Sequence, residues 1–153
     1  MKKVDLIFKN AILLTMDKSM KIYDPGALAI EGDHIVKAGI DIDIFNDFTS
    51  ETIIDCQGGV LMPGLINAHT HVPMTLLRGL ADDLRLDVWL MGYMMPVERE
   101  FVSPDFVQLG TRLACAEMIR SGVTCFADMY YFEEEIAKSL SLYQPTIEVI
   151  LPR

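Results

Sequence analysis

The sequence predicts an α/β fold, and two observations carry this prediction. Residues 1–58 contain several short runs of β-type residues separated by turn residues, which is typical of a small sheet. After Gly59 the pattern changes to strand, helix, strand and helix, an order that favours parallel strands joined by crossover helices. The sequence therefore predicts a β-rich segment over residues 1–58 and strand–helix units over residues 59–153.

The start of the chain predicts a bent strand. Residues 4–15 alternate in character at their beginning, with Val4, Leu6 and Phe8 on one face. The opposite face then carries two charged side chains and one isoleucine. Asn10 interrupts the apolar pattern and marks a bend.

A hairpin is the clearest feature of the β-rich segment. Two β-type runs, residues 27–31 and 34–38, flank the turn residues Gly32 and Asp33. One more short strand and a glycine-rich turn follow over residues 52–64. Together these strands predict a small sheet or sandwich.

Two strands and a helix are predicted next. The apolar runs 64–69 and 123–130 read as strands, and the first is continuous enough to be buried on both faces. Residues 85–101 read as a helix that Pro96 bends or breaks.

Residues 103–122 predict the best-defined helix. Ser103 is a good N-cap, Pro104 fits the first turn, and Gly122 is a C-terminal stop. Apolar side chains recur at helical spacing, at Phe106, Leu109, Leu113 and Ala116. A second, shorter helix is predicted over residues 132–140.

Composition narrows the classes of function. The chain has 153 residues, 51% apolar and 23% charged, so it can bury a core and is not disordered. Its net charge of -9 argues against nucleic acid or an anionic membrane as a partner, and no apolar run approaches a membrane span of ~20 residues. The three cysteines, Cys56, Cys115 and Cys125, form no C-x-x-C pair, which suits free buried thiols and a cytoplasmic location.

The histidines point to a metal site. The chain has three, and two of them, His69 and His71, lie two residues apart at the end of a predicted strand. Residues i and i+2 of a strand point to the same side, so both imidazoles project together with Asn67. Two converging neutral imidazoles are good ligands for zinc or a similar divalent metal. The alternative is a pair of surface or hydrogen-bonded histidines without a metal.

These residues lie in motifs that resemble the amidohydrolase superfamily. "DCQGGVLMPGLINAHTHVPM" is similar to the segment that leads into the first barrel strand of that superfamily, and "TLLRGLADDLRLDVWL" and "VTCFADMYYFEEEIAKSL" resemble its adenosine-type deaminases and related chlorohydrolases. The resemblance covers residues 1 to about 140. It implies the N-terminal part of a TIM-type β/α barrel, preceded by strands of a composite β-sandwich.

The resemblance assigns roles to four residues. It implies that His69 and His71 bind one divalent metal ion, zinc or another such as iron, that Trp89 lines the substrate pocket, and that Glu98 accepts hydrogen bonds from ribose hydroxyls. The residues alone leave other interpretations open. Trp89 could equally pack between helices, and Glu98 beside Arg99 is more typical of a solvated face.

The implied reaction is hydrolytic deamination of an adenosine-type nucleoside such as 5-methylthioadenosine or S-adenosylhomocysteine. Guanine, cytosine or a triazine is the alternative substrate class. A complete barrel takes ~250 residues, and the family's other metal ligands and acid–base groups lie on later strands. We therefore expect an incomplete barrel, no catalytic residue within the chain and no activity of the chain alone.

Two explanations of such a chain stay open. It is the N-terminal part of a deaminase shortened by a frameshift or a gene break, or it is a non-catalytic product that binds metal weakly or is a partner for another chain. In either case, unpaired barrel strands favour self-association.

Overall fold

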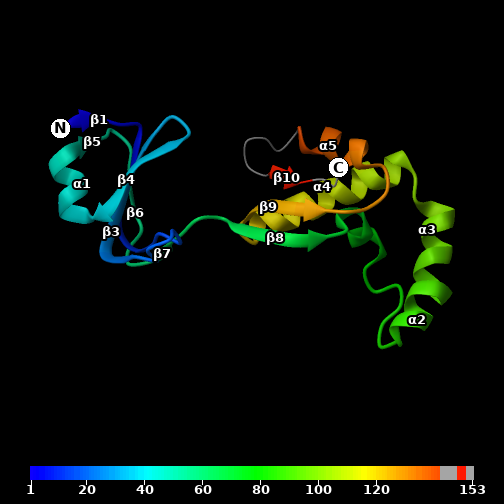
Figure 1. The fold of residues 1–153 in the computed structure, drawn as a ribbon. Coiled ribbons are helices and arrows are strands. Elements are labelled where there is room, and N and C mark those ends of the chain that lie inside the picture. The colour runs from blue at the N-terminus through cyan, green and yellow to red at the C-terminus, as the bar shows by residue number, and fades with distance from the viewer. Residues whose placement is uncertain (142–147, 151–153) are drawn as a thin grey trace. The chain divides into compact units, whose positions relative to one another are not determined.

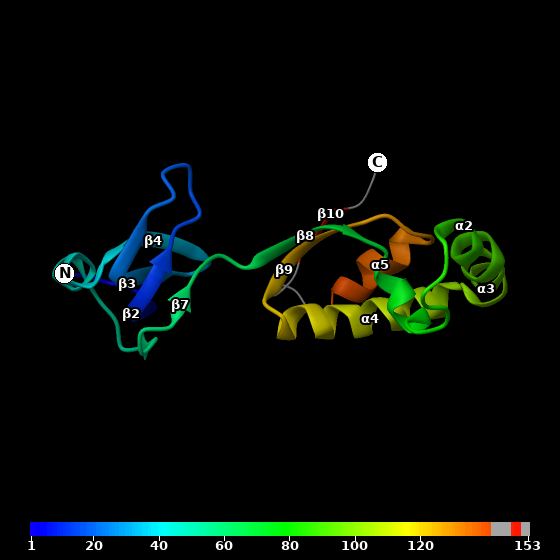
Figure 2. The ribbon, with the colours of Figure 1, turned by 90° about the horizontal axis from the view of Figure 1, so that it is seen from below.

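The computed structural model describes residues 1–141 and 148–150, and it is an α/β protein (Figure 1, Figure 2). The chain divides into two compact units, Met1–Pro63 and Gly64–Arg153. The division falls a few residues after the predicted one, because Val60 and Leu61 still pair with a strand of the first unit. No helix in the described ranges is long and apolar enough to cross a membrane.

The first unit is built on a mixed five-stranded sheet. In the order β4-β3-β2-β6, with β7 also paired to β2, its strands are His34–Ile40, Ile22–Glu31, Leu6–Leu14, Ile53–Asp55 and Val60–Leu61. A second, parallel pair joins β1 (Lys2–Lys3) to β5 (Phe48–Thr49). The composite β-sandwich stays a prediction.

The predicted hairpin and bend are both present. Strands β3 and β4 are antiparallel around a turn in which Gly32 has a φ of 59°. Asn10 has a φ of 54°, and the register of β2 against β3 shifts between Phe8 and Ala11, so the strand bends there. The shift places an extra residue in β2 and explains why the simple alternation ends.

The first unit departs from the predicted pattern in two places. Strand β2 and the segment before it bury Val4, Ile7, Ala11 and Leu13, whereas Leu6 and Phe8 are only partly buried, so burial does not follow the predicted alternation. Helix α1 (Asp41–Asp47) was not predicted, because it is short and buries only Ile44. Val4, Ile7 and Ile44 pack together in this unit's core, and such a contact has no local periodicity in the sequence.

The second unit is a parallel sheet with helices between its strands, as predicted. Its order is β10-β9-β8, with the bounds Glu148–Ile150, Val123–Asp128 and Leu65–Thr70. The helical elements are η1 (Val72–Leu77, a 3-10 helix), α2 (Leu86–Val88), η2 (Trp89–Met94, a π-helix), α3 (Met95–Phe101), α4 (Pro104–Arg120) and α5 (Glu133–Leu140). Figure 2 shows α4 and α5 on one face of the sheet formed by β8 and β9.

Strand β8 is not buried on both faces, which corrects the prediction for residues 64–69. Leu65 and Ile66 are 49% and 70% exposed. Within the described part of the chain, β8 is hydrogen-bonded on one edge only, to β9, and the helices cover one face. The apolar run therefore has a free edge and an uncovered face.

Helix α4 has the predicted ends but buries a different face. The Ser103 Oγ accepts a hydrogen bond from the Phe106 backbone N–H, and Gly122 has a φ of 78° just after the helix. Leu109 and Leu113 are exposed, and the buried positions are Val107, Gly110, Thr111, Ala114 and Cys115. The spacing of large apolar side chains did not indicate this face, because the buried face consists mostly of small residues.

Gly110 shows why small residues are needed there. A Cβ at this position would lie 2.6 Å from the Pro73 carbonyl oxygen, so α4 and η1 approach each other at the backbone. The core beside this contact contains Val72, Cys115 and Phe126. This close packing supports η1 directly after the histidine pair.

Pro96 lies where the helical segment changes type, and the two helical elements on either side follow each other directly. The π-helix η2 ends at Met94, and α3 begins at Met95 with Pro96 in its first turn. Because proline lacks a backbone donor, the preceding backbone cannot keep a regular hydrogen-bond ladder, and a π segment is one way to absorb this. Trp89 lies in this segment.

Candidate active site

The candidate site lies where β8 and β9 end. His69 is in β8, and His71 directly follows this strand. Their ring centroids are 5.2 Å apart, and the angle between the ring planes is 70°. The two imidazoles therefore lie together, as expected from the two-residue period of a strand. His69 is exposed and His71 is partly buried.

A backbone carbonyl holds the His71 ring. Its Nδ1 lies 2.5 Å from the Met129 carbonyl oxygen, which can only accept a hydrogen bond. Nδ1 therefore carries the proton in this contact, and Nε2 keeps its lone pair. Histidines that bind metals usually donate their second ring N–H to a carbonyl or a carboxylate in this manner.

The geometry of the two rings fits a shared metal ion. Two imidazoles bound to one tetrahedral zinc would have ring centroids roughly 5 Å apart, close to the spacing of His69 and His71. The described ranges contain no group of three or more His, Cys, Asp or Glu side chains that could hold a metal. A catalytic zinc usually has three protein ligands, so two imidazoles alone would be only part of such a ligand set.

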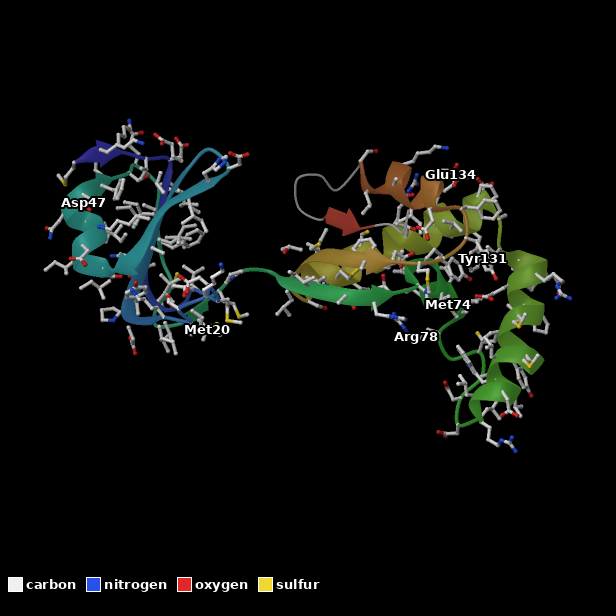
Figure 3. All side chains as sticks on the ribbon, viewed as in Figure 1. Met20, Asp47, Met74, Arg78, Tyr131 and Glu134 are labelled. Atoms are coloured by element: carbon white, nitrogen blue, oxygen red, sulfur yellow. The ribbon has the colours of Figure 1, made fainter. Side chains whose placement is uncertain are left out.

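A cavity of about 360 Å³ adjoins His71. Its lining consists of His71, Met74, Trp89, Leu90, Glu98, Met129, Tyr130 and Tyr131. Figure 3 labels Met74 and Tyr131 of this lining, which come from η1 and from the loop between β9 and α5. Three of the four residues singled out from the sequence, His71, Trp89 and Glu98, thus meet at one cavity, whereas His69 lies outside its lining.

Tyr130 lies near both Glu98 and His71 in this cavity. Its hydroxyl donates a hydrogen bond of 2.7 Å to Glu98 Oε1, and its ring centroid lies 6.1 Å from that of His71. Burial, together with the hydrogen bond to Glu98, raises the pKa of the Tyr130 phenol far above its usual range, so it stays a donor. Glu98 Oε2 makes no hydrogen bond to a described residue.

The sequence reasoning missed Tyr130. The only signal for it was its place after a strand of a predicted parallel sheet, because functional side chains gather at that edge. A tyrosine at such a position is also common in a core, so the signal was weak. The hydrogen bond to Glu98 depends on packing between residues 32 positions apart.

Asp128 ends β9 and was also missed. The residue is 3% exposed, and its Oδ1 accepts from the Val72 backbone N–H at 2.8 Å and lies 2.6 Å from the Thr70 hydroxyl. Burial raises the pKa of this carboxyl, although the hydrogen bonds from Thr70 and Val72 and the nearby His71 lower it. Oδ2 is buried and has no hydrogen-bond partner among the described residues.

A known family matches the part of the chain that contains the candidate site. Residues 60–152 match the profile of the Amidohydrolase family, so the match extends beyond residue 140, where the resemblance of the motifs ended. A 5-methylthioadenosine/S-adenosylhomocysteine deaminase of Syntrophus aciditrophicus is 45% identical over 91% of this chain and 31% of its own length. A 5'-deoxyadenosine deaminase of Methanococcoides burtonii is 48% identical over 89% of this chain and 30% of its own length.

Solved structures give the same picture of the fold. A zinc-bound adenosine deaminase of Xanthomonas campestris is 38% identical with a TM-score of 0.84, over 93% of this chain and 32% of that one. An atrazine chlorohydrolase of Arthrobacter aurescens is 20% identical and has a TM-score of 0.78 over 97% of this chain and 35% of that one, a likeness of fold alone. The chain spans about a third of the length of the curated relatives it matches. It belongs to the amidohydrolase family.

Proposed function

We propose that this chain provides the first part of the active site of a hydrolase that deaminates an adenosine-type nucleoside. The observation that carries the proposal is the cavity where His71, Trp89 and Glu98 meet. In this proposal His69 and His71 bind one divalent metal ion, and Trp89 and Glu98 bind the substrate. The second unit then contributes the first strand–helix pairs of a β/α barrel.

The relatives support this choice of substrate class. Their names refer to 5-methylthioadenosine, S-adenosylhomocysteine and 5'-deoxyadenosine, which are all adenosines altered at the 5' position. The solved relative at 38% identity has bound zinc, which supports zinc over iron or another divalent ion. Free thiols at all three cysteines agree with a cytoplasmic location, which stays a prediction.

The proposed roles of the histidines follow from their contacts. A divalent metal held by imidazoles lowers the pKa of a bound water towards ~7. The hydrogen bond from His71 Nδ1 to Met129 fixes the tautomer of the ring and leaves Nε2 as a lone-pair donor to a metal. His69 provides the second imidazole from the same side of β8.

The cavity suits a nucleoside better than a free base. Trp89, Leu90 and Met74 offer an apolar wall to a purine or to a 5' substituent. Glu98 has one carboxylate oxygen bound to Tyr130 and a second available to accept from a ribose hydroxyl. A substrate without ribose would leave that acceptor unused, which disfavours guanine, cytosine or a triazine.

The proposed enzyme needs further groups. In this proposal Glu98 and Tyr130 of the cavity serve substrate binding, so proton transfer to the substrate needs further acid–base side chains. We therefore expect no turnover by the 153-residue chain alone. The free edge of β8, with its exposed Leu65 and Ile66, is where more strands of a barrel or a second copy would pair.

A chimera tests this function. In it, residues 1–140 of this chain replace the matching segment of the Methanococcoides burtonii 5'-deoxyadenosine deaminase, and ammonia release from 5'-deoxyadenosine is measured. We expect activity in the chimera and none in the 153-residue chain. Glu98→Ala should reduce activity on nucleosides and leave activity on a free base unchanged.

Two results would contradict the proposal. One is a folded chimera that releases no ammonia, where circular dichroism and a cooperative melt establish folding. The other is an equal loss on nucleosides and free bases in the Glu98→Ala variant, which would remove the ribose-binding role.

A further inference from the structure

We propose that Asp128 is a positioning residue for His71: its buried carboxylate holds both chain neighbours of the histidine, so that the imidazole keeps one orientation and one tautomer. The inference deepens the proposed function, because it rests on His71 as a metal ligand. Asp128 itself lies beneath the site and is not in the lining of the cavity.

The contacts of Asp128 and Met129 enclose His71. Asp128 Oδ1 binds the Thr70 hydroxyl at 2.6 Å on one side of the histidine and the Val72 N–H at 2.8 Å on the other. The Met129 N–H donates to the Thr70 carbonyl at 3.2 Å, and the Met129 carbonyl accepts from His71 Nδ1 at 2.5 Å. Asp128 and Met129 thus contact the three consecutive residues 70–72, where β8 ends and η1 begins.

The backbone at His71 needs such support. Its φ of -133° and ψ of 71° belong neither to β8, which ends at Thr70, nor to η1, which begins at Val72. No side chain caps η1 from the His71 position, and the Val72 N–H is one of the donors that a helix start leaves without an internal partner. Asp128 satisfies that donor, and it thereby fixes the point where the chain turns from strand to helix.

The carboxylate is costly at this position, which argues for more than packing. Asp128 lies beside the core that contains Cys115 and Phe126, and Oδ2 is buried without a hydrogen-bond partner in the described part of the chain. A buried polar atom without a partner lowers stability, whereas an apolar side chain would avoid that loss. The hydrogen bonds on either side of His71 are what an apolar side chain could not provide.

Two readouts separate positioning from a purely structural role. The first is the tautomer of His71 in the metal-free 153-residue chain, measured by long-range ¹H–¹⁵N correlation at a pH where the ring is neutral. The second is the affinity for Zn²⁺, measured by competition with a chromophoric chelator. Wild type should show the Nδ1–H tautomer at His71. In Asp128→Ala we expect a mixture of tautomers at His71, an unchanged His69, and an affinity reduced roughly tenfold to a hundredfold.

Matched variants keep the test decisive. Asp128→Asn retains the Oδ1 acceptor and should stay within about threefold of wild type in zinc affinity. Thr70→Val keeps the side-chain volume nearly constant but removes the hydroxyl, which lies 2.6 Å from Asp128 Oδ1 and 2.8 Å from the Ala127 carbonyl oxygen, and it should cost about threefold. This variant replaces Asp128→Ala in the test if the alanine variant does not fold.

The outcomes divide cleanly. A folded Asp128→Ala variant with the wild-type tautomer and affinity would overturn the inference, and so would Asp128→Asn if it lost as much as the alanine variant. If wild type binds no zinc but Asp128→Ala still alters the His71 tautomer, the positioning role stands and the proposed metal site fails.

Discussion

The β3–β4 hairpin and the ends of β8 and β9 both carry histidine, but the two regions hold it differently. His34 begins β4, its side chain is 81% exposed, and its ring lies against the carboxylate of its neighbour Asp33. His71 is bound by the carbonyl of Met129, which is 58 positions away in the sequence. The first contact is local and open to water, whereas the second depends on the pairing of two strands.

This difference shows which contacts make a histidine suitable as a metal ligand. The contact of His34 is exposed and involves only a neighbouring side chain, so the ring leaves it for other rotamers at little cost. At the end of β8, one ring nitrogen is occupied and the chain on both sides is fixed, which leaves a single nitrogen for a ligand. We expect substitutions in the two regions to differ in their effects on activity and stability.

Removal of each histidine in the chimera should separate the two regions most strongly. We expect His71→Asn to lower kcat/KM for 5'-deoxyadenosine by on the order of a thousandfold, because the proposed metal site would lose a ligand. His34→Asn should leave kcat/KM within about twofold, since its partner is an exposed neighbour. Steady-state ammonia release measures both. Similar losses in the two variants would remove the distinction between the regions.

A second contrast concerns glycines. Gly110→Ala would place a Cβ 2.6 Å from the Pro73 carbonyl oxygen, and we expect it to lower the free energy of unfolding of the second unit by about 2–3 kcal/mol. Gly92→Ala in η2 of the same unit would meet only the Val88 Cγ1 atom, at 4.0 Å, and should change the stability of this unit little. Urea unfolding followed by the fluorescence of Trp89, the only tryptophan of the chain, reports on the second unit. A wild-type midpoint for Gly110→Ala would contradict the close approach of α4 and η1.

The buried thiol of the second unit should make its stability depend on alkaline pH. Burial, with a smaller effect of Asp128, raises the pKa of the Cys115 thiol to about 11. The unfolded chain loses this proton near the ordinary thiol value, so stability is kept below pH ~9 and falls as pH rises through about 11. We expect a loss of about 2 kcal/mol relative to Cys115→Val across this window.

Cys56 of the first unit gives the control for this prediction. Its thiol is only partly buried, so Cys56→Val should leave the pH profile of unfolding close to that of wild type. Urea unfolding at pH 8 and pH 11 measures all three proteins. Parallel profiles for wild type and Cys115→Val would show that the thiol does not ionise differently on unfolding.

The smallest effect concerns the phenol at the cavity. Tyr130→Phe keeps the ring but removes the hydrogen bond to Glu98, so we expect KM for the nucleoside to rise about fivefold to tenfold in the chimera. KM for a free base should not change, because the role we propose for Glu98 is to bind the ribose. Tyr131→Phe is the matched control, since Tyr131 is exposed and has no hydrogen bond from its hydroxyl to a described residue. An equal effect of both substitutions would count against a specific role of Tyr130.

The sequence could predict the features that depend on local chemistry. The turn at Gly32, the cap at Ser103 and the stop at Gly122 each need only a few neighbouring residues, and all three are present. The same is true of the pairing of His69 with His71, because the two-residue period of a strand places both on one side.

The rest depends on contacts between distant segments. The register that sets Thr70 opposite Asp128 decides which carbonyl meets His71, and no local pattern contains it. The buried face of α4 is set by a close approach at Gly110, which hydrophobicity does not register. Tyr130 and Asp128 were missed for the same reason, since their partners lie 32 and 56 positions away.

Anomalous X-ray scattering from crystals of the 153-residue chain grown with Zn²⁺ would show whether His69 and His71 bind a metal ion together. We predict a zinc peak about 2.0–2.1 Å from one ring nitrogen of His69 and from Nε2 of His71, with Nδ1 of His71 still bound to the Met129 carbonyl. A zinc ion at His34 with none between His69 and His71, or one bound through Nδ1 of His71, would contradict it.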